Sequence, residues 1–314
     1  PALLAGCCVV LKPSQYTPLT AYILAELIDE AGYPAGVFNL VTGCGPEVGN
    51  ALALHPDVRM LSFTGSTAAG REVARLALSN IKRIALELGG KSAAILLPGG
   101  DWEFGVKAVL DTVVLNAGQT CNALTRLLVP AAEQEKANEI ILNTLKQYKK
   151  GSNADPESDI GPLSSRRQFD RVKKYIQIGI DEGATLLCGG LPGQDAEYRI
   201  DPTVFVNVKP GMRIEKEEIF GPVLVVVPYE TVDDAVRIAN DSEYGLAGAV
   251  FGPEAEANAV ARRMRTGSIY VNYGQWDVKA PFGGYKQSGI GREGAVEGYE
   301  EFLEVKTIYD REGE

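Results

Sequence analysis

The sequence predicts an α/β protein made of two doubly wound units, and three observations support this prediction. Over the first 97 residues, short apolar runs rich in β-forming residues alternate with helical patterns. From Asp101 onward the alternation continues with longer elements. The 314 residues are 45% hydrophobic and 23% charged, a globular composition with enough chain for about two cores. Repeated βαβ units predict a parallel sheet in each unit.

In the first unit, helices are predicted where apolar residues recur every three or four positions, and strands where short β-rich runs occur. We expect strands at residues 7–11, 37–41, 60–63, 83–86 and 93–97. We expect the intervening helices at residues 17–31, 46–54 and 66–78. The unit ends near Leu88-Gly89-Gly90, where two glycines are expected to free the backbone as a hinge.

The second unit is predicted from the same two patterns. We expect helices near residues 102–116, 132–148, 164–182, 232–239 and 254–264. We expect strands near residues 126–129, 223–227, 249–251 and 268–271. Residues 303–309 alternate like one further strand, which has no obvious partner nearby in the sequence.

Charge and apolar patterning exclude several classes of partner. With 31 Lys and Arg against 41 Asp and Glu, the net charge is −10, so we expect no nucleic-acid or anionic-membrane partner. The longest apolar stretches, residues 1–11 and 223–228, are well short of the ~20 residues that cross a bilayer. Leu4-Ala5-Gly6-Cys7 has the form of a lipoprotein cleavage box but lacks the preceding basic and apolar regions. The start at Pro1, without an initiator Met, suggests a fragment or a processed product.

The numbers of histidines and cysteines limit the kinds of catalytic and metal site that the chain can form. His55 is the only histidine, which disfavours Ser-His-Asp triads and multi-histidine metal sites, so no metal is expected. A carboxylate, thiol or lysine would have to carry the protons. Five scattered cysteines without a paired metal spacing suit a reduced, cytoplasmic setting.

Two glycine-containing turns are candidate phosphate sites. The run from Gly43 through Gly45 to Gly49 follows a predicted strand and opens a helix, although its last glycine is one position late for the dinucleotide fingerprint. The second turn places Ser66 at a helix N-cap after a strand, where free N–H groups can bind a pyrophosphate. The alternative in both places is an ordinary strand-to-helix turn.

Glu87 and Cys121 are the candidate catalytic side chains. Glu87 ends an apolar strand, where a salt-bridged carboxylate is the alternative to a general base. Cys121 ends the polar loop Asn116-Ala117-Gly118-Gln119-Thr120, whereas Cys7, Cys8 and Cys188 lie in apolar settings typical of inert thiols. Cys121 is therefore the predicted nucleophile.

Short motifs that contain these residues occur in order over essentially the whole chain, and Glu87 and Cys121 lie 34 positions apart. The motifs are Leu11-Lys12-Pro13-Ser14, Phe63-Thr64-Gly65-Ser66-Thr67, Glu87-Leu88-Gly89-Gly90-Lys91, Gly118-Gln119-Thr120-Cys121, Glu217-Glu218-Ile219-Phe220-Gly221-Pro222, and Pro281-Phe282-Gly283-Gly284-Tyr285-Lys286 with Ser288-Gly289. Together these motifs closely resemble those of the aldehyde dehydrogenase superfamily.

The resemblance implies a role for each matching residue. Cys121 would be the nucleophile and Glu87 the general base, while Lys12 would bind the adenosine ribose. Glu218 would hold the nicotinamide ribose with Phe220 beside the ring. The implied cofactor-binding set is Lys12, Gln15, Gly45, Gly65, Ser66, Gly70, Leu88, Glu218 and Phe220, and the implied substrate pocket includes Trp276 and Phe282.

The resemblance also implies a domain plan and an activity. Residues 1–89 would form a Rossmann-like dinucleotide-binding domain, 90–289 the catalytic domain, and 290–314 a return segment with an oligomerisation strand. The implied activity is oxidation of a small aldehyde to a carboxylic acid with NAD or NADP, in a homodimer or homotetramer. A CoA-acylating enzyme and a truncated, inactive or structural relative are the alternatives.

Three departures from the family pattern qualify the expectation. The chain begins after the family's oxyanion-hole Asn and after the first strand of the cofactor sheet, so we expect an exposed strand edge and weakened oxyanion binding. Gln15 stands where many NAD-using members carry Glu, so NADP stays open. The loop at residues 273–280 belongs to a region that varies with the substrate, so no particular aldehyde is predicted.

Overall fold

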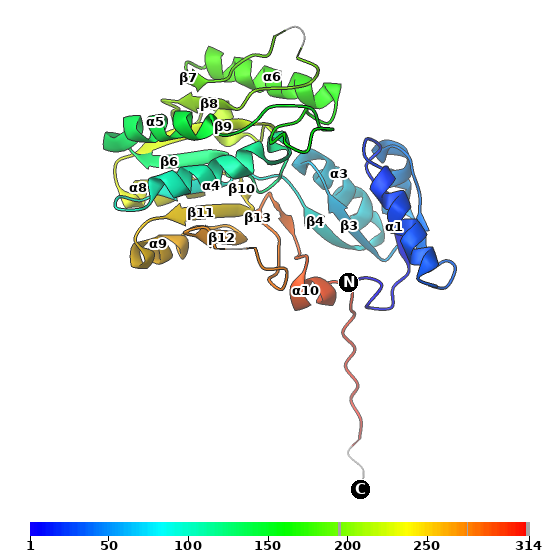
Figure 1. Cartoon of the computed structure of the whole chain (residues 1–314). Helices are drawn as coiled ribbons and strands as arrows, with labels where there is room; N and C mark the ends of the chain where they lie inside the picture. The colour runs from blue at the N-terminus through cyan, green and yellow to red at the C-terminus, as the bar shows by residue number, and fades with distance from the viewer. Residues whose placement is uncertain (194–195, 275, 312–314) are drawn as a thin grey trace.

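The largest sheet has seven strands and lies beside the N-terminal elements, on the left in Figure 1. The computed structural model describes residues 1–193, 196–274 and 276–311. The strand order is β12-β11-β5-β6-β9-β8-β7, parallel throughout except for the antiparallel pair β7 and β8. The strands are β5 (Ala93–Leu96), β6 (Arg126–Pro130), β7 (Thr185–Cys188), β8 (Thr203–Val206), β9 (Val223–Tyr229), β11 (Ala247–Phe251) and β12 (Ser268–Val271).

Helices cover both faces of this sheet, which gives it two cores. The helices α4 (Trp102–Val114) and α5 (Gln134–Leu145) pack on one face. The other face is covered by α6 (Arg166–Asp181), α8 (Val232–Asn240) and α9 (Glu254–Ala261). Alternate residues of β5 enter opposite cores, Ile95 one and Leu96 the other. Because both faces of the sheet are buried, the central strands of the sheet are continuous apolar runs.

The N-terminal strands form two small sheets instead of the single sheet that was predicted. In one, β1 (Val9–Leu11) pairs in parallel with β2 (Phe38–Leu40). In the other, β3 (Met60–Thr64) pairs in parallel with β4 (Arg83–Glu87), and β14 (Gly289–Ile290) pairs antiparallel to β4. Because no described backbone pairing joins β1 to β3, the expectation of one continuous sheet is wrong for the described residues. Their helices are α1 (Leu19–Glu30), α2 (Asn50–Leu54) and α3 (Thr67–Ala77).

Residues 303–309 do not form the predicted strand. They run away from the body as an extended tail (Figure 1), and Val305 and Tyr309 are 95% and 93% exposed. A strand needs a neighbouring backbone for its ladder of hydrogen bonds, and none of the described residues supplies one. The alternating pattern is present, but by itself it does not make a strand.

Several short elements lie outside the sequence prediction. They span two to six residues, which is shorter than the window over which a period can be recognised. Besides β7, β8 and β14 they are β10 (Tyr244–Gly245), β13 (Tyr285–Lys286), α7 (Arg213–Lys216) and α10 (Ala295–Glu300). The pair β10 and β13 is antiparallel and brings the C-terminal motif back to the main body.

Candidate active site

The loop that carries Cys121 has an unusual backbone. Helix α4 ends at Val114, two residues before the predicted end, because Asn116 and Ala117 adopt left-handed φ angles of 52° and 53°. Gly118 follows with φ 72°, and a Cβ there would lie 2.2 Å from the carbonyl oxygen of Gly221. Left-handed non-glycine residues are strained and persist only where surrounding packing holds them. This strain turns the chain sharply and leaves Cys121 half-buried.

Glu87 ends β4 as a buried carboxyl group, only 5% exposed. Its Oε2 atom has no hydrogen-bond partner among the described residues. Burial, helped by the negative charge of Glu293, raises the pKa of Glu87 to about 8, although Arg292 opposes the shift. A carboxyl group with such a pKa can both accept and give up a proton near neutral pH.

Gly89 and Gly90, which follow Glu87 and Leu88 in the chain, lie in close contact with the segments that carry Glu218 and Cys121. A Cβ on Gly89 would lie 2.4 Å from Oε2 of Glu218, and one on Gly90 would lie 2.4 Å from the carbonyl oxygen of Cys121. The N–H of Gly90 donates to Oε1 of Glu218 at 3.1 Å. Both glycines are buried, and neither has a left-handed φ. The structure thus gives these glycines the role of close approach, in place of the predicted free hinge.

The negative charges of two carboxylates, Glu218 and Glu87, act on the Cys121 thiol. Burial raises its pKa, and the charges of Glu218 and Glu87 raise it further. Hydrogen bonds from the backbone N–H groups of Asn122 and of Cys121 itself act in the opposite direction. The thiol is therefore mostly protonated in this structure, and forming the thiolate requires a base.

Two side chains of α6 hold the segment that contains Glu218 and Phe220, and the sequence prediction did not include them. Gln168 Nε2 donates to the carbonyl oxygen of Phe220 at 2.6 Å, and Arg171 Nη2 donates to that of Glu218 at 2.5 Å. Phe220 has a left-handed φ of 61°, so these contacts stabilise a strained turn. Gln168 and Arg171 are three positions apart on one helix face, but nothing in that spacing identifies the carbonyls they meet.

The predicted adenosine-end residues lie at the carboxyl ends of β1 and β2. Lys12 Nζ donates to the carbonyl oxygen of Gly43 at 3.4 Å and to that of Pro13 at 2.6 Å, so Lys12 reaches the glycine turn after β2. Gly45 begins a π-helical turn, Gly45–Gly49, which continues into α2. Gln15 is exposed.

The second glycine turn joins β3 to α3 as the sequence predicted. Ser66 is the N-cap of α3, and its hydroxyl accepts from the N–H of Ala69 at 3.3 Å. The N–H of Gly65 donates to the carbonyl oxygen of Glu87 at 3.0 Å, which ties the turn to the end of β4. A Cβ on Gly70 would lie 2.4 Å from Cδ2 of Leu88, so α3 packs closely on that residue.

The predicted substrate-pocket residues contact each other. The rings of Trp276 and Phe282 are tilted with centroids 5.4 Å apart, and Trp276 is 56% exposed. A pair made of the exposed Trp276 and the half-buried Phe282 offers an apolar surface with a defined shape.

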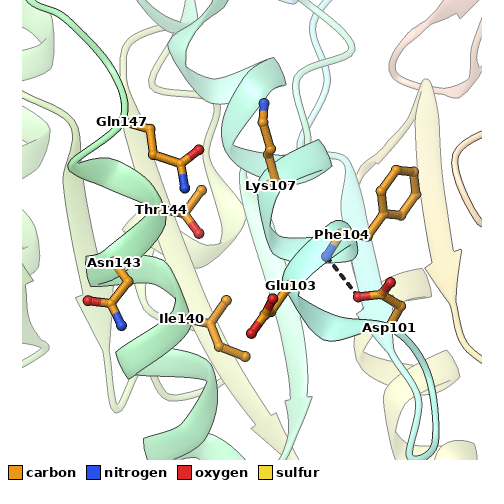
Figure 2. A pocket seen from close by; sticks show the side chains of 8 residues that line it. All are labelled: Asp101, Glu103, Phe104, Lys107, Ile140, Asn143, Thr144 and Gln147. Atoms are coloured by element: carbon orange, nitrogen blue, oxygen red, sulfur yellow. Dashed lines mark hydrogen bonds between the residues drawn. The ribbon is translucent and has the colours of Figure 1, made fainter.

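A separate groove lies between α4 and α5 on the outside of the sheet (Figure 2). Most of its lining side chains are polar or charged, with Phe104 and Ile140 as the apolar ones. The carboxylate of Asp101 caps α4 by accepting from the N–H of Phe104, as Figure 2 shows. None of the predicted site residues lines this groove. Within the described residues, no group of three or more potential ligands could hold a metal ion, and no helix has the length and apolar character needed to span a bilayer.

The fold and this grouping of side chains define an α/β protein that presents a thiol and a buried carboxyl group beside glycine-lined turns. The chain belongs to the aldehyde dehydrogenase family, whose model matches residues 1–308. It is 49% identical over 317 residues to a 3-succinoylsemialdehyde-pyridine dehydrogenase of a Pseudomonas species, covering all of this chain and 66% of the relative. A putative aldehyde dehydrogenase of Bacillus subtilis is 44% identical over 310 residues, covering 98% of this chain and 63% of the relative.

Solved structures of aldehyde dehydrogenases are also similar to this chain. A mutant of aldehyde dehydrogenase C from Pseudomonas syringae, in complex with NAD+ and octanal, superposes with a TM-score of 0.96 at 47% identity, covering 98% of this chain and 64% of that one. An aldehyde dehydrogenase of Mycobacterium tuberculosis in complex with NAD+ has a TM-score of 0.93 at 48% identity, covering 96% and 63%. The chain thus spans about two thirds of the length of the relatives it matches.

Proposed function

We propose that the protein oxidises an aldehyde to a carboxylic acid with NAD(P)+, using Cys121 as the nucleophile and Glu87 as the general base. The observation that supports this most is the convergence of Cys121, Glu87 and Glu218 around Gly89 and Gly90. A thiol, a base and a carboxylate suited to a ribose are thereby held by packed backbone, as a preorganised site requires.

The first half-reaction uses Cys121. Its thiolate adds to the aldehyde carbonyl carbon, so a C–S bond forms and the carbonyl π pair moves to oxygen. The N–H of Cys121 is available as one donor to that oxygen. When the alkoxide reforms its carbonyl, the C–H electron pair leaves as hydride and a thioester on Cys121 remains. The nicotinamide, when bound, accepts that hydride.

The second half-reaction uses Glu87. Its carboxylate accepts a proton from water while the water oxygen attacks the thioester carbonyl. The C–S bond then breaks, the carboxylic acid leaves, and the sulfur of Cys121 carries the electron pair as thiolate. The initial deprotonation of the thiol also needs a base, and the pKa of the thiol responds to the charges of Glu218 and Glu87.

The residues at the strand ends suit a dinucleotide. The turn that begins at Gly45, and the start of α3 after Gly65 with Ser66 as its N-cap, suit phosphates. We assign Lys12 and Gln15 to the adenosine ribose, Gly70 and Leu88 to close packing under the cofactor, and Glu218 and Phe220 to the nicotinamide end. Two related structures contain NAD+, which supports NAD for this chain and leaves NADP as a proposal.

The domain plan follows as part of the proposal. Residues 1–89 bind the cofactor, residues 90–289 carry the nucleophile, and residues 290–314 are the return segment, whose described part up to Arg311 pairs with β4 and continues into the exposed tail. We propose that the tail serves oligomerisation in a cytoplasmic homodimer or homotetramer. Trp276 and Phe282 would line the aldehyde pocket, and the octanal in the Pseudomonas syringae complex supports an apolar chain there.

Trapping the acyl-enzyme tests the proposal directly. With aldehyde and NAD+ added together and the reaction quenched in acid, we expect one acyl group on the peptide that contains Cys121, accompanied by one equivalent of NADH. Peptide mass spectrometry locates the adduct. An adduct confined to Cys44 or Cys188, or NADH without any adduct, would contradict the assignment.

Gln15 is expected to permit NADP binding. A neutral amide does not repel a 2′-phosphate, whereas a carboxylate ~4 Å from it would cost about 4 kcal/mol per pair of unit charges at an effective dielectric near 20. Gln15→Glu is therefore expected to weaken NADPH binding at least about tenfold more than NADH binding. Fluorescence titration with each reduced cofactor measures this, and Gln15→Asn serves as the uncharged control. If wild type has no measurable NADP affinity, the prediction is wrong.

A further inference from the structure

Lys91 is a fully buried lysine whose amine the proposed reaction does not use. It directly follows Gly90 and is 2% exposed, and its Nζ atom has no hydrogen-bond partner among the described residues. The neighbouring Ser92 Oγ is also buried without a partner there. Buried polar atoms are nearly always hydrogen-bonded, so these two atoms indicate a missing partner.

A small cavity lies beside both residues. Arg126, Tyr244 and Thr266 also line it, and it has room for about one water molecule. A cavity of that size, lined by apolar residues together with two residues whose polar atoms lack partners among the described residues, is of the kind that holds an ordered water. Such a water could bind both the Lys91 amine and the Ser92 hydroxyl.

The charged groups that act on Lys91 come from β6, from α7 and from the segment that follows α7. Arg126 of β6 donates through Nε to the Lys91 carbonyl at 2.9 Å and adds a positive charge, while Tyr244 of β10 lines the cavity. Three carboxylates, Glu215 of α7 and then Glu217 and Glu218, add negative charge. Burial and Arg126 lower the pKa of Lys91 to about 7, against the opposing effect of the carboxylates.

The three carboxylates differ in their ion pairs. Glu215 is paired with Arg126 at 3.0 Å, and Glu217 with Arg213 at 2.6 Å. The ion pairs found among the described residues include no partner for Glu218, which accepts from the Gly90 N–H instead. Burial raises the pKa of Glu218, and the Gly90 N–H, the charge of Arg171 and the charge of Lys91 oppose that shift, so Lys91 and Glu218 are electrostatically coupled.

We propose that Lys91 and one water in this cavity form a proton-linked positioning site that sets the preference of the nicotinamide end for the oxidised or the reduced cofactor. This rests on the proposed function, since it requires Glu218 to hold the nicotinamide ribose. The oxidised ring is positively charged and the reduced ring is neutral. Protonated Lys91 therefore disfavours NAD+ relative to NADH, and neutral Lys91 removes that penalty.

The sign of the pH effect follows from the charge. As pH rises through about 7, Lys91 loses its proton and the affinity for NAD+ increases relative to that for NADH. By linkage, NAD+ binding near neutral pH releases part of a proton, and NADH binding releases less. Glu87 titrates in a neighbouring range, so the test is made with Glu87→Gln as the parent protein.

The experiment compares two proteins, the Glu87→Gln parent and the parent with Lys91→Met. In the parent, the ratio of the NAD+ to the NADH dissociation constant should fall about fivefold or more between pH 6 and pH 8. With Lys91→Met the ratio should be constant and equal to the parent's value at pH 8. Calorimetry in two buffers of different ionisation enthalpy should show proton release on NAD+ binding in the parent alone. Lys91→Gln is a second neutral variant should the methionine protein not fold.

A second measurement needs neither cofactor nor folded variant. With lysine labelled at the ε carbon with carbon-13, one resonance of the wild-type protein should titrate near neutral pH. No such resonance, or an unchanged pH dependence of the ratio in Lys91→Met, would overturn the role of Lys91. A titrating lysine in a protein that binds neither cofactor would instead overturn the proposed function, and with it the link to Glu218.

Discussion

Replacing Cys121 by alanine is expected to lower kcat/KM for aldehyde oxidation by about 10⁴-fold or more, because no other described thiol shares its position beside Glu87 and Glu218. The thioester cannot form without the sulfur, so the burst of NADH should disappear together with turnover. Cofactor affinity should change little, since the backbone of the loop is held by Asn116, Ala117 and Gly118. A steady-state assay with a stopped-flow measurement of NADH absorbance checks both.

The matched control is Cys188→Ala. Cys188 lies on β7 at the far edge of the main sheet, and its thiol donates to the carbonyl oxygen of Pro202 at 3.9 Å. Burial raises the pKa of its thiol as it does for Cys121, so the two cysteines differ mainly in their surroundings. Full activity in Cys121→Ala, or equal losses in both variants, would refute the nucleophile assignment.

Replacing Glu87 by glutamine is expected to slow turnover by about 10² to 10⁴-fold while leaving a burst of about one equivalent of NADH. The amide cannot accept a proton from water, so hydrolysis of the thioester becomes the slow step. The wild-type rate of hydrolysis should rise with pH through about 8, since the carboxyl group is protonated below that value and ionised above it. In Glu87→Gln this rise should be absent.

The Glu293→Gln variant tests the effect of a neighbouring charge on the pKa of Glu87 while Glu87 itself is kept. The negative charge of Glu293 raises the pKa of Glu87, so removing that charge should shift the pH profile to lower pH and keep its shape. Glu87→Gln should instead remove the profile. Pre-steady-state bursts measured from pH 6 to pH 9 distinguish the two results. An unchanged hydrolysis rate in Glu87→Gln would show that another group activates the water.

Local patterns were sufficient to predict most of the long elements. The three- and four-residue spacing of apolar side chains located α1, α3, α6 and α8 to within a few residues, and β12 was predicted with its observed ends. Ser66 was predicted as an N-cap from its residue type and its place after a strand, and the structure confirms it. These features depend on short-range backbone and side-chain preferences, which are present in any stretch of ten to fifteen residues.

The sequence by itself determined the α/β class, the family, and Cys121 and Glu87 as the candidate catalytic residues, because the motif residues and their order can be read directly from the sequence. Only the tertiary structure decided how the site is assembled. Gly89 and Gly90 are needed for contact with Glu218 and Cys121, and Phe220 is held in a strained turn by Gln168 and Arg171. The raised pKa of Glu87, and the lack of a hydrogen-bond partner for the Lys91 amine among the described residues, likewise arise from burial between segments far apart in sequence. Residues 303–309 show the same limit, since strand pairing and desolvation depend on neighbours that no local pattern specifies.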